Sequence, residues 1–220
     1  MKRILKLTDD GSHTLYLPEM DENYHSTHGA IQESKHVFIE AGLKQIRKKE
    51  ITVFEVGFGT GLNALLTLLE TERSNISVHY IGIEKYPLNS EEYGQLNYAD
   101  LLNSNCQKEF QYIHQCEWNS VQAITDSFRL YKLRDDIISC SFADLPRFDL
   151  IYFDAFAPNK QDGVWDIEIF RKIQAHCNPD ARFVTYCAKG SVRRDLQEVG
   201  FKMERIPGPP GKKEMLTGIN

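Results

Sequence analysis

Short, strongly apolar runs alternate with stretches of helical periodicity along most of this 220-residue chain. Near-continuous apolar runs bounded by loops are typical of strands in a parallel sheet whose two faces are both covered by helices. Alternation of such strands with helices predicts an α/β fold, with a mostly parallel, doubly wound sheet. The expected strands are 52–56, 79–84, 137–142, 148–154, 182–186, 201–205 and 214–218, and the expected helices are 31–49, 62–72, 167–177 and 191–199.

Both ends of the chain are expected to depart from this parallel pattern. The segment 207–211 is too short to hold a crossover helix, so the last strand should be antiparallel to the one before it. Near the start, residues 8–12 are typical of a turn between two short strands, 4–7 and 14–17. We therefore expect a small N-terminal β-hairpin appendage within residues 1–30 and the main domain in residues 31–220.

The composition excludes several classes of protein. The five cysteines contain no C-x-x-C pair, which argues against a zinc site or a disulfide framework and suits a reducing compartment. The histidines show no metal-ligand spacing, so no metal site is expected. No apolar stretch matches a signal peptide or a membrane span, which predicts a cytoplasmic protein with no membrane contact.

The charge of the chain is unevenly distributed. A net charge of −5 does not indicate a nucleic-acid-binding protein as a whole. Between Lys189 and Lys213, however, seven basic residues stand against three acidic ones, a local net charge of +4. Such a run is usually a solvated surface, and it favours a phosphate-binding patch only where other features point to an RNA substrate.

A glycine-rich loop follows the expected strand 52–56. Glycines at this position let the backbone turn sharply and approach a ligand beside a helix N-terminus. The spacing is G-x-G-x-G, whereas a dinucleotide-binding loop has two residues before its third glycine, so hydride transfer from NAD is disfavoured. An acid two residues upstream completes a pattern that resembles the first motif of Rossmann-like methyltransferases. The residues are Glu55, Gly57, Gly59 and Gly61.

Two acids after the next strands are candidates for the rest of a nucleoside site. Glu84 closes the expected strand 79–84, where a carboxylate accepts hydrogen bonds from both hydroxyls of a ribose. The alternative is a surface glutamate at a strand end. Asp144, after the expected strand 137–142, is placed to meet the edge of an adenine, or else is a turn residue before Pro146.

Asp154 ends the expected strand 148–154, at the carboxyl edge of the sheet where ligands bind. Methyl transfer is an in-line displacement, so an enzyme mainly supplies proximity and alignment. A carboxylate here could orient a substrate amine and take up its proton. Phe156, Pro158 and Trp165 would then form a flat apolar slot for a base. The alternative is that Asp154 caps a turn and that the aromatic residues belong to the core.

Together these motifs resemble the methyltransferase half of the bacterial bifunctional enzymes of the MnmC type, and its stand-alone MnmD-type versions. Those enzymes make 5-methylaminomethyl-2-thiouridine at the wobble position of tRNA. The aspartate segment and the terminal basic segment are the most distinctive matches. The matching segments are Glu33–Phe38, Val56–Asn63, Glu84–Leu88, Asp154–Trp165, Val192–Arg194, Gly200–Phe201 and Lys212–Leu216.

The resemblance implies S-adenosylmethionine as cofactor and the exocyclic amine of 5-aminomethyl-(2-thio)uridine as methyl acceptor, with Asp154 beside that amine. It implies that the segment around Tyr24 to Ser26 folds over the cofactor, and it adds Asn63 and Lys85 to the cofactor site. On the substrate side it implies a tRNA anticodon loop as partner. The residues expected to contact that tRNA are Phe156, Pro158, Lys160, Trp165, Arg193, Arg194, Lys212 and Lys213.

Two departures from the family pattern bear on these expectations. The bifunctional enzymes carry a flavin oxidase that this sequence does not show, so we expect methylation alone and no flavin. The turn 208–211 is Gly-Pro-Pro-Gly where the family has Gly-Phe-Gly, which alters the expected local substrate contacts.

Three other readings remain open from the sequence. Methylation of a small-molecule amine suits the acidic net charge but not the basic segment. Aminopropyl transfer uses the same fold with an aspartate near this position. A non-catalytic RNA-binding module would not need both the glycine loop and Asp154.

Overall fold

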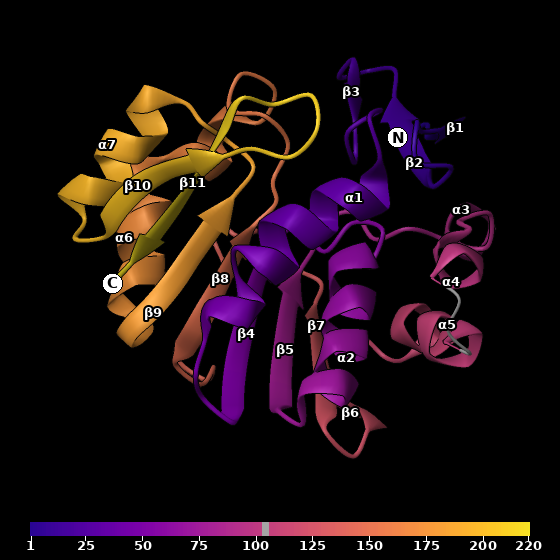
Figure 1. Cartoon of the computed structure of the whole chain (residues 1–220), viewed down its shortest axis with the longest axis horizontal. Coiled ribbons are helices and arrows are strands. Elements are labelled where there is room, and N and C mark those ends of the chain that lie inside the picture. Colours follow the sequence, from indigo (N-terminus) through magenta and orange to yellow (C-terminus); the bar gives the residue numbers. More distant parts are fainter. Residues whose placement is uncertain (103–105) are drawn as a thin grey trace.

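The computed structural model describes residues 1–102 and 106–220 and has a mostly parallel central sheet, with helices on both faces (Figure 1). In this part of the chain the sheet has eight strands in the order β10-β11-β9-β8-β4-β5-β7-β6. Strands β7, β5, β4, β8 and β9 are parallel, and β6, β10 and β11 are antiparallel to their neighbours. The strands are β4 Glu50–Val56, β5 Ser77–Ile83, β6 Val121–Thr125, β7 Phe128–Leu133, β8 Phe148–Phe153, β9 Cys177–Thr185, β10 Lys202–Pro207 and β11 Glu214–Ile219.

The helices divide between the two faces of the sheet, as Figure 1 shows. On one face lie α1 (Ala30–Ser34), which continues directly into the π-helix η1 (Lys35–Glu40), and α2 (Leu62–Ser74). On the other lie α6 (Ile167–Ala175) and α7 (Gly190–Glu198). The remaining helices are η2 Leu43–Gln45, α3 Ser90–Tyr93, α4 Tyr98–Leu101, α5 Gln107–Gln115 and η3 Asp162–Trp165.

Residues of the central strands point alternately into two separate cores. Val53 and Tyr152 pack toward α1 and α2, whereas Phe54 and Phe153 pack toward α6 and α7. Because side chains alternate across a strand, a strand covered on both faces must be apolar at nearly every position. All six residues of β8 are buried for this reason.

The strand order reverses between β4 and β8, and this reversal positions the site. From β4 the chain adds β5 and then β7 on one side of the sheet, and from β8 it adds β9 on the other. Val56 and Phe153 end the two strands as register partners, and the Asp154 N–H donates to the Val56 carbonyl at 2.9 Å. In an open α/β sheet a reversal of this kind leaves a crevice at the carboxyl ends of the strands.

The sequence-based expectations about the end of the sheet are confirmed, and one central strand is wrong. β10 and β11 form the antiparallel pair expected around the segment 207–211. The expected strand 137–142 is not a strand, however, and its place beside β5 is taken by β7. Burial in β7 alternates, and its buried positions include Lys132, so the strand lacks a continuous apolar run. The expected helix 31–49 is also shorter and irregular, since it ends at Glu40 before η2.

The N-terminal hairpin is confirmed, with one strand more than expected. β1 (Ile4–Leu7), β2 (His13–Leu17) and β3 (Glu22–Asn23) form a three-stranded antiparallel sheet. Figure 1 shows this small sheet beyond the end of the central strands, next to α1. Within the described residues no helix is long and apolar enough to cross a membrane.

Candidate active site

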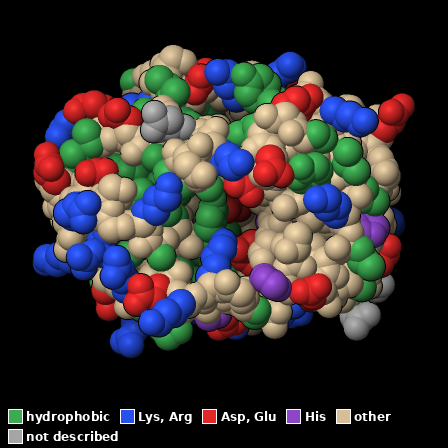
Figure 2. Space-filling view, turned by 90° about the horizontal axis from the view of Figure 1, so that it is seen from above, with side chains coloured by type: hydrophobic (Ala, Val, Ile, Leu, Met, Phe, Trp, Pro, Cys, Tyr) green, Lys and Arg blue, Asp and Glu red, His purple; other side chains and the backbone are tan. Residues whose placement is uncertain are grey.

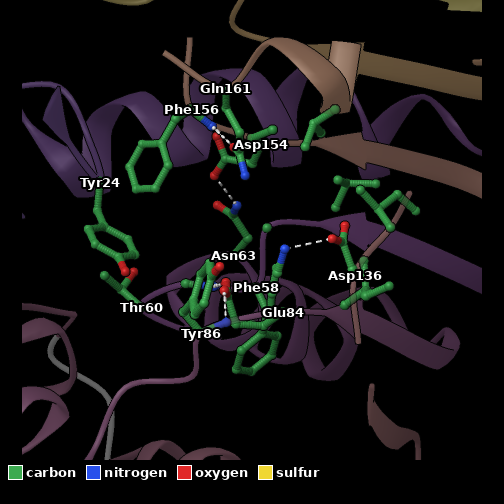
Figure 3. Close-up of a pocket in the computed structure, with 18 of the residues that line it drawn as sticks. Tyr24, Phe58, Thr60, Asn63, Glu84, Tyr86, Asp136, Asp154, Phe156 and Gln161 are labelled. Carbon is green, nitrogen blue, oxygen red and sulfur yellow. Dashed lines mark hydrogen bonds and ion pairs between the residues drawn. The ribbon is translucent and has the colours of Figure 1, made fainter. Parts of the chain in front are cut away.

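A cavity lies at the carboxyl ends of β4, β5 and β8, with an empty volume of about 860 Å³ including the part open to solvent. Figure 3 shows side chains from several distant segments converging on it. Of the expected site residues, those that line it are Tyr24, Gly57, Gly59, Asn63, Glu84, Lys85, Asp154 and Phe156.

The glycine loop forms one wall of the cavity, and its conformation requires glycine. Gly57 has φ 88°, and a Cβ there would lie 2.6 Å from the Asp154 carbonyl oxygen. Gly59 has φ 47°, and a Cβ there would touch the Tyr24 ring at 3.0 Å. Gly61 is the N-cap of α2 and offers no side-chain cap to the free N–H groups of the helix. Such an uncapped helix N-terminus favours a negatively charged ligand group.

Glu84 joins the glycine loop to the segment that follows β5. Its Oε2 accepts a hydrogen bond from the Gly59 N–H at 3.0 Å, and its Oε1 accepts one from the Tyr86 N–H at 2.8 Å. A carboxylate oxygen has a second lone pair, so each can still accept a hydroxyl. Glu84 thus has the geometry expected of an acid that holds both hydroxyls of a ribose.

Asp144 does not line the cavity. It is exposed in the irregular segment that replaces the expected strand 137–142. The acids that follow the true neighbouring strand, β7, are Asp135 and Asp136, and both line the cavity. Both oxygens of Asp136 are engaged, by Lys85 Nζ at 2.7 Å and by the Ile138 N–H at 3.0 Å. Asp135 accepts one hydrogen bond, from the Asp136 N–H to its Oδ1 at 2.7 Å, and is a second candidate for contact with the base of a nucleoside.

Three side chains form a polar network at the base of the cavity. Asn63 Nδ2 donates to Glu55 Oε1 and to Asp154 Oδ2, each at 2.8 Å, and Figure 3 shows the bond to Asp154. Complete burial raises the pKa of Glu55 well above its ordinary range. The Oδ1 atom of Asn63 has no hydrogen-bond partner among the described residues. A buried amide oxygen in a cavity wall is a natural acceptor for an amino group of a ligand.

Asp154 has the chemical character of a proton acceptor. Enclosure by the protein raises its pKa to about 7, the nearby Glu33 carboxylate adds to this, and the Asn63 amide and the Lys212 ammonium oppose it. A carboxyl whose pKa lies near the working pH exchanges a proton readily with a bound group.

The aromatic residues after Asp154 divide between the cavity and the core. Phe156 lines the cavity and meets the Tyr24 ring edge to face, with ring centroids 5.1 Å apart. Trp165 is instead 5 % exposed, packs against Phe153 and donates from its indole N–H to the Phe156 carbonyl at 2.7 Å. The Trp165 ring thus lies in the core, which favours the alternative left open by the sequence, and its contact with a substrate base stays a prediction.

Two cavity residues in this region were not expected from the sequence. Gln161 accepts a hydrogen bond from the Phe156 N–H at 3.2 Å. Thr60, in the glycine loop, is hydrogen-bonded to His25 at 2.6 Å, and burial lowers the pKa of that histidine to about 4. The segment Tyr24–His25 therefore lies directly over the glycine loop.

Of the residues expected to contact tRNA, Phe156 lines the cavity and the others lie outside its lining. Pro158 and Lys160 are half-buried near the Asp154 segment, and Arg193, on α7, is also half-buried. Arg194 and Lys213 are exposed. Lys212 is not a free surface lysine, since its Nζ donates to the buried Glu33 at 2.7 Å.

The family model described as S-adenosyl-L-methionine-dependent methyltransferase matches residues 99–220, more than half of the chain. The tRNA 5-methylaminomethyl-2-thiouridine biosynthesis bifunctional protein MnmC of Burkholderia multivorans is 31% identical, over 97% of this chain and 34% of its own length. Its counterpart in Cupriavidus necator is 34% identical, over 91% of this chain and 32% of its own length. The chain thus spans about a third of the length of these curated relatives.

A solved structure is similar over nearly the whole chain. The crystal structure of MNMC2 from Aquifex aeolicus superposes with a TM-score of 0.77 at 25% sequence identity, covering 99% of this chain and 70% of that one. The glycine loop of the cavity lies before the residues that the family model matches, and the relatives cover both parts of the chain. The chain therefore belongs to the S-adenosyl-L-methionine-dependent methyltransferase family, with S-adenosylmethionine as its cofactor.

Proposed function

We propose that this methyltransferase methylates the exocyclic amine of 5-aminomethyl-(2-thio)uridine at the wobble position of tRNA. The observation that carries the proposal is Asp154, a carboxylate at the carboxyl end of β8 that lines the cofactor cavity and has a pKa raised to about 7. A primary amine is mostly protonated at neutral pH and must lose a proton before it can attack. A carboxylate with a raised pKa is suited to accept that proton.

The cofactor residues under this proposal follow from the geometry of the cavity. Glu84 holds the ribose hydroxyls and Asp135 faces the adenine, while the N-terminus of α2 receives the carboxylate of the amino-acid part. The unpartnered Asn63 Oδ1 receives its amino group. When bound, S-adenosylmethionine supplies a methyl group on a positively charged sulfur.

The chain's own residues prepare the amine. Asp154 accepts one proton from the substrate ammonium, and Asn63 holds the carboxylate in place through its 2.8 Å hydrogen bond. The freed nitrogen lone pair forms the new N–C bond while the C–S bond breaks and its electron pair stays on sulfur. The product is a secondary ammonium, and Asp154 returns its proton to water. Phe156 and Tyr24 shield this step from solvent.

The surface beside the cavity supports an RNA substrate. Figure 2 looks onto the cavity face and shows Lys and Arg side chains gathered on the side that carries α7 and the β10–β11 hairpin, at the left, with acidic side chains in the central hollow. The exposed basic residues there are Lys189, Arg194, Lys202, Arg205 and Lys213. Phosphate groups bind such a surface. Under this proposal the protein acts in the cytoplasm on the anticodon loop of tRNA and uses no flavin. Residues 1–30 form a segment that covers the cofactor, and residues 31–220 form the methyltransferase domain.

The test is transfer of label from methyl-labelled S-adenosylmethionine to bulk tRNA from cells that lack this gene, followed by nucleoside analysis. We expect the label in 5-methylaminomethyl-type uridine. Label in another nucleoside would contradict the assigned atom. No label in tRNA, with the cofactor still bound, would favour a small-molecule amine as substrate.

A further inference from the structure

A buried ion pair stands beside the methyl-transfer site, formed by residues 179 positions apart in the sequence. Lys212 Nζ donates to Glu33 Oε1 at 2.7 Å, and the Ser26 N–H donates to Glu33 Oε2 at 2.8 Å. The Glu33 side chain is 8% exposed and that of Lys212 is 34% exposed. A carboxylate this buried is stable in its charged form only with such partners.

Tyr186 connects this ion pair to the segment that carries Asp154. Lys212 Nζ lies 3.8 Å from the centroid of the Tyr186 ring, a cation–π contact. The Tyr186 hydroxyl donates to the carbonyl of Ala155 at 2.8 Å. Ala155 follows Asp154 and itself lines the cavity. The position of the Lys212 ammonium is thus fixed relative to the catalytic carboxylate by a continuous set of contacts.

The charges around Asp154 are unequal in number. Glu33 and Asp154 are carboxylates, and the Lys212 ammonium interacts electrostatically with both, so these three groups carry a net charge of −1 when Asp154 is ionised. Burial raises the pKa of Glu55 well above its ordinary range, which favours the uncharged form of that carboxyl. The titratable groups that couple to Asp154 are Glu33 from α1, Lys212 from the β10–β11 turn, Glu55 from β4, Tyr80 from β5 and Tyr186 after β9.

We propose that Glu33 and Lys212 are positioning residues for methyl transfer, which together leave a single negative charge at Asp154 for a cationic primary amine. This rests on the proposed function. The single charge is complementary to one ammonium group, and it favours an aminomethyl base over an uncharged uridine. Under this proposal Lys212 is not part of the phosphate-binding surface, because its ammonium group, which was expected to face tRNA, is paired with Glu33.

The charge arrangement predicts opposite effects for two substitutions. Lys212→Met removes a nearby cation and should therefore shift the acid limb of the pH–rate profile to higher pH by about one unit. At pH values on that limb the rate should fall about ten-fold. Glu33→Gln removes a nearby anion and should move that limb down. Lys212→Arg keeps the charge and should restore most of the lost rate. General damage to the fold would not move the limb in opposite directions.

The neighbouring Lys213 is the matched comparison, because it is exposed whereas Lys212 is paired. For Lys213→Met we expect a higher KM for tRNA and a shallower salt dependence, with no displacement of the pH profile. Binding of S-adenosylmethionine, measured by calorimetry, checks that each variant is folded. If Lys212→Met and Lys213→Met behave alike, Lys212 is a phosphate contact and the proposal is wrong.

A second readout does not depend on the substrate. Carboxyl ¹³C NMR of protein labelled at aspartate gives the titration of Asp154 directly, in wild type, Lys212→Met and Glu33→Gln. Shifts of opposite sign support the role of the pair, and shifts that are absent or of one sign overturn it. Opposite shifts in a protein that methylates no tRNA would overturn the proposed substrate while leaving the action of the pair on Asp154 intact.

Discussion

Gly57 and Asp154 are so close that a Cβ on Gly57 would lie 2.6 Å from the carbonyl oxygen of Asp154. The glycine loop follows β4 and Asp154 follows β8, so this contact joins the two segments at the point where the strand order reverses. The site depends on this close approach of two backbone segments as well as on its side chains.

Gly57→Ala should abolish measurable binding of S-adenosylmethionine by calorimetry, because the added methyl group must push the Asp154 segment away. The left-handed conformation alone costs an alanine about 1–2 kcal/mol. Gly11→Ala is a matched control, since Gly11 has φ 81° but no atom within 4 Å of a built Cβ. We expect that control to lose a similar amount of stability and to bind the cofactor normally. Equal cofactor affinity in the two variants would contradict the role of the close contact.

Glu84→Gln should weaken S-adenosylmethionine binding by about thirty-fold, the equivalent of about 2 kcal/mol for a lost hydrogen bond to a charged group. Asp144→Asn provides the comparison, because Asp144 is exposed and away from the cavity. Calorimetric titration of both variants distinguishes them. A larger loss at Asp144 than at Glu84 would mean that the nucleoside lies elsewhere.

Asp154→Asn should reduce methyl transfer by at least about a hundred-fold, the lower end of what general-base catalysis contributes, while cofactor binding persists. In the wild type, kcat/KM should rise with pH and level off above about 7, where Asp154 is ionised. A pH-independent wild-type rate between pH 5 and pH 9, or full activity in the variant, would exclude Asp154 as the proton acceptor.

The same carboxyl should also affect stability. The folded protein raises the pKa of Asp154 from 3.8 to about 7, so between these values the folded state binds the proton that the unfolded state has released. The contribution of Asp154 to the free energy of unfolding therefore decreases as pH rises from about 4 to about 7. Chemical denaturation of the wild type and Asp154→Asn across this range measures the difference. If the stability of the wild type relative to Asp154→Asn instead increases as pH rises from about 4 to about 7, the pKa of Asp154 is not raised.

Arg194→Ala with Lys213→Ala should weaken tRNA binding and reduce the slope of log affinity against log salt by about 2, one for each lost phosphate contact. The control is Lys108→Ala, an exposed lysine on α5 on the far side of the molecule in Figure 1. Filter binding at several salt concentrations gives the slopes. If the double variant and the control have the same slope, the α7 side of the protein does not contact RNA.

Most of the fold could be predicted because strands buried on both faces of a sheet appear in the sequence as short apolar runs. β8 is apolar at every position except Asp149, β4 contains the apolar pair Val53 and Phe54, and the short segment between β10 and β11 excludes a crossover. β7 was missed because Lys132 is buried in it, with Nζ donating to the His114 carbonyl at 2.7 Å. That pairing depends on a residue outside the strand, so no local pattern reveals it. The misplaced strand also directed the prediction to Asp144, which lies outside the cavity, and away from Asp135, which lines it.

The candidate site was predictable where residues follow directly after strands. The glycine loop, Glu84 and Asp154 all occupy such positions, and the topology brings them together. Glu33 was not predicted as a site residue, because its role depends on Lys212 at the other end of the chain. Trp165 could not be assigned between core and substrate slot from sequence, since both demand an aromatic ring; its packing against Phe153 decides for the core.

The most direct test of the account is a single-turnover transfer from enzyme-bound, methyl-labelled S-adenosylmethionine to an anticodon stem-loop with 5-aminomethyl-2-thiouridine at the wobble position. A stem-loop with unmodified uridine and otherwise the same sequence is the control. If the enzyme methylates the amine, we expect label on the aminomethyl nitrogen of the first RNA and none in the second. No transfer to the first RNA, or equal transfer to both, would contradict an amine-directed methyltransferase built around Asp154.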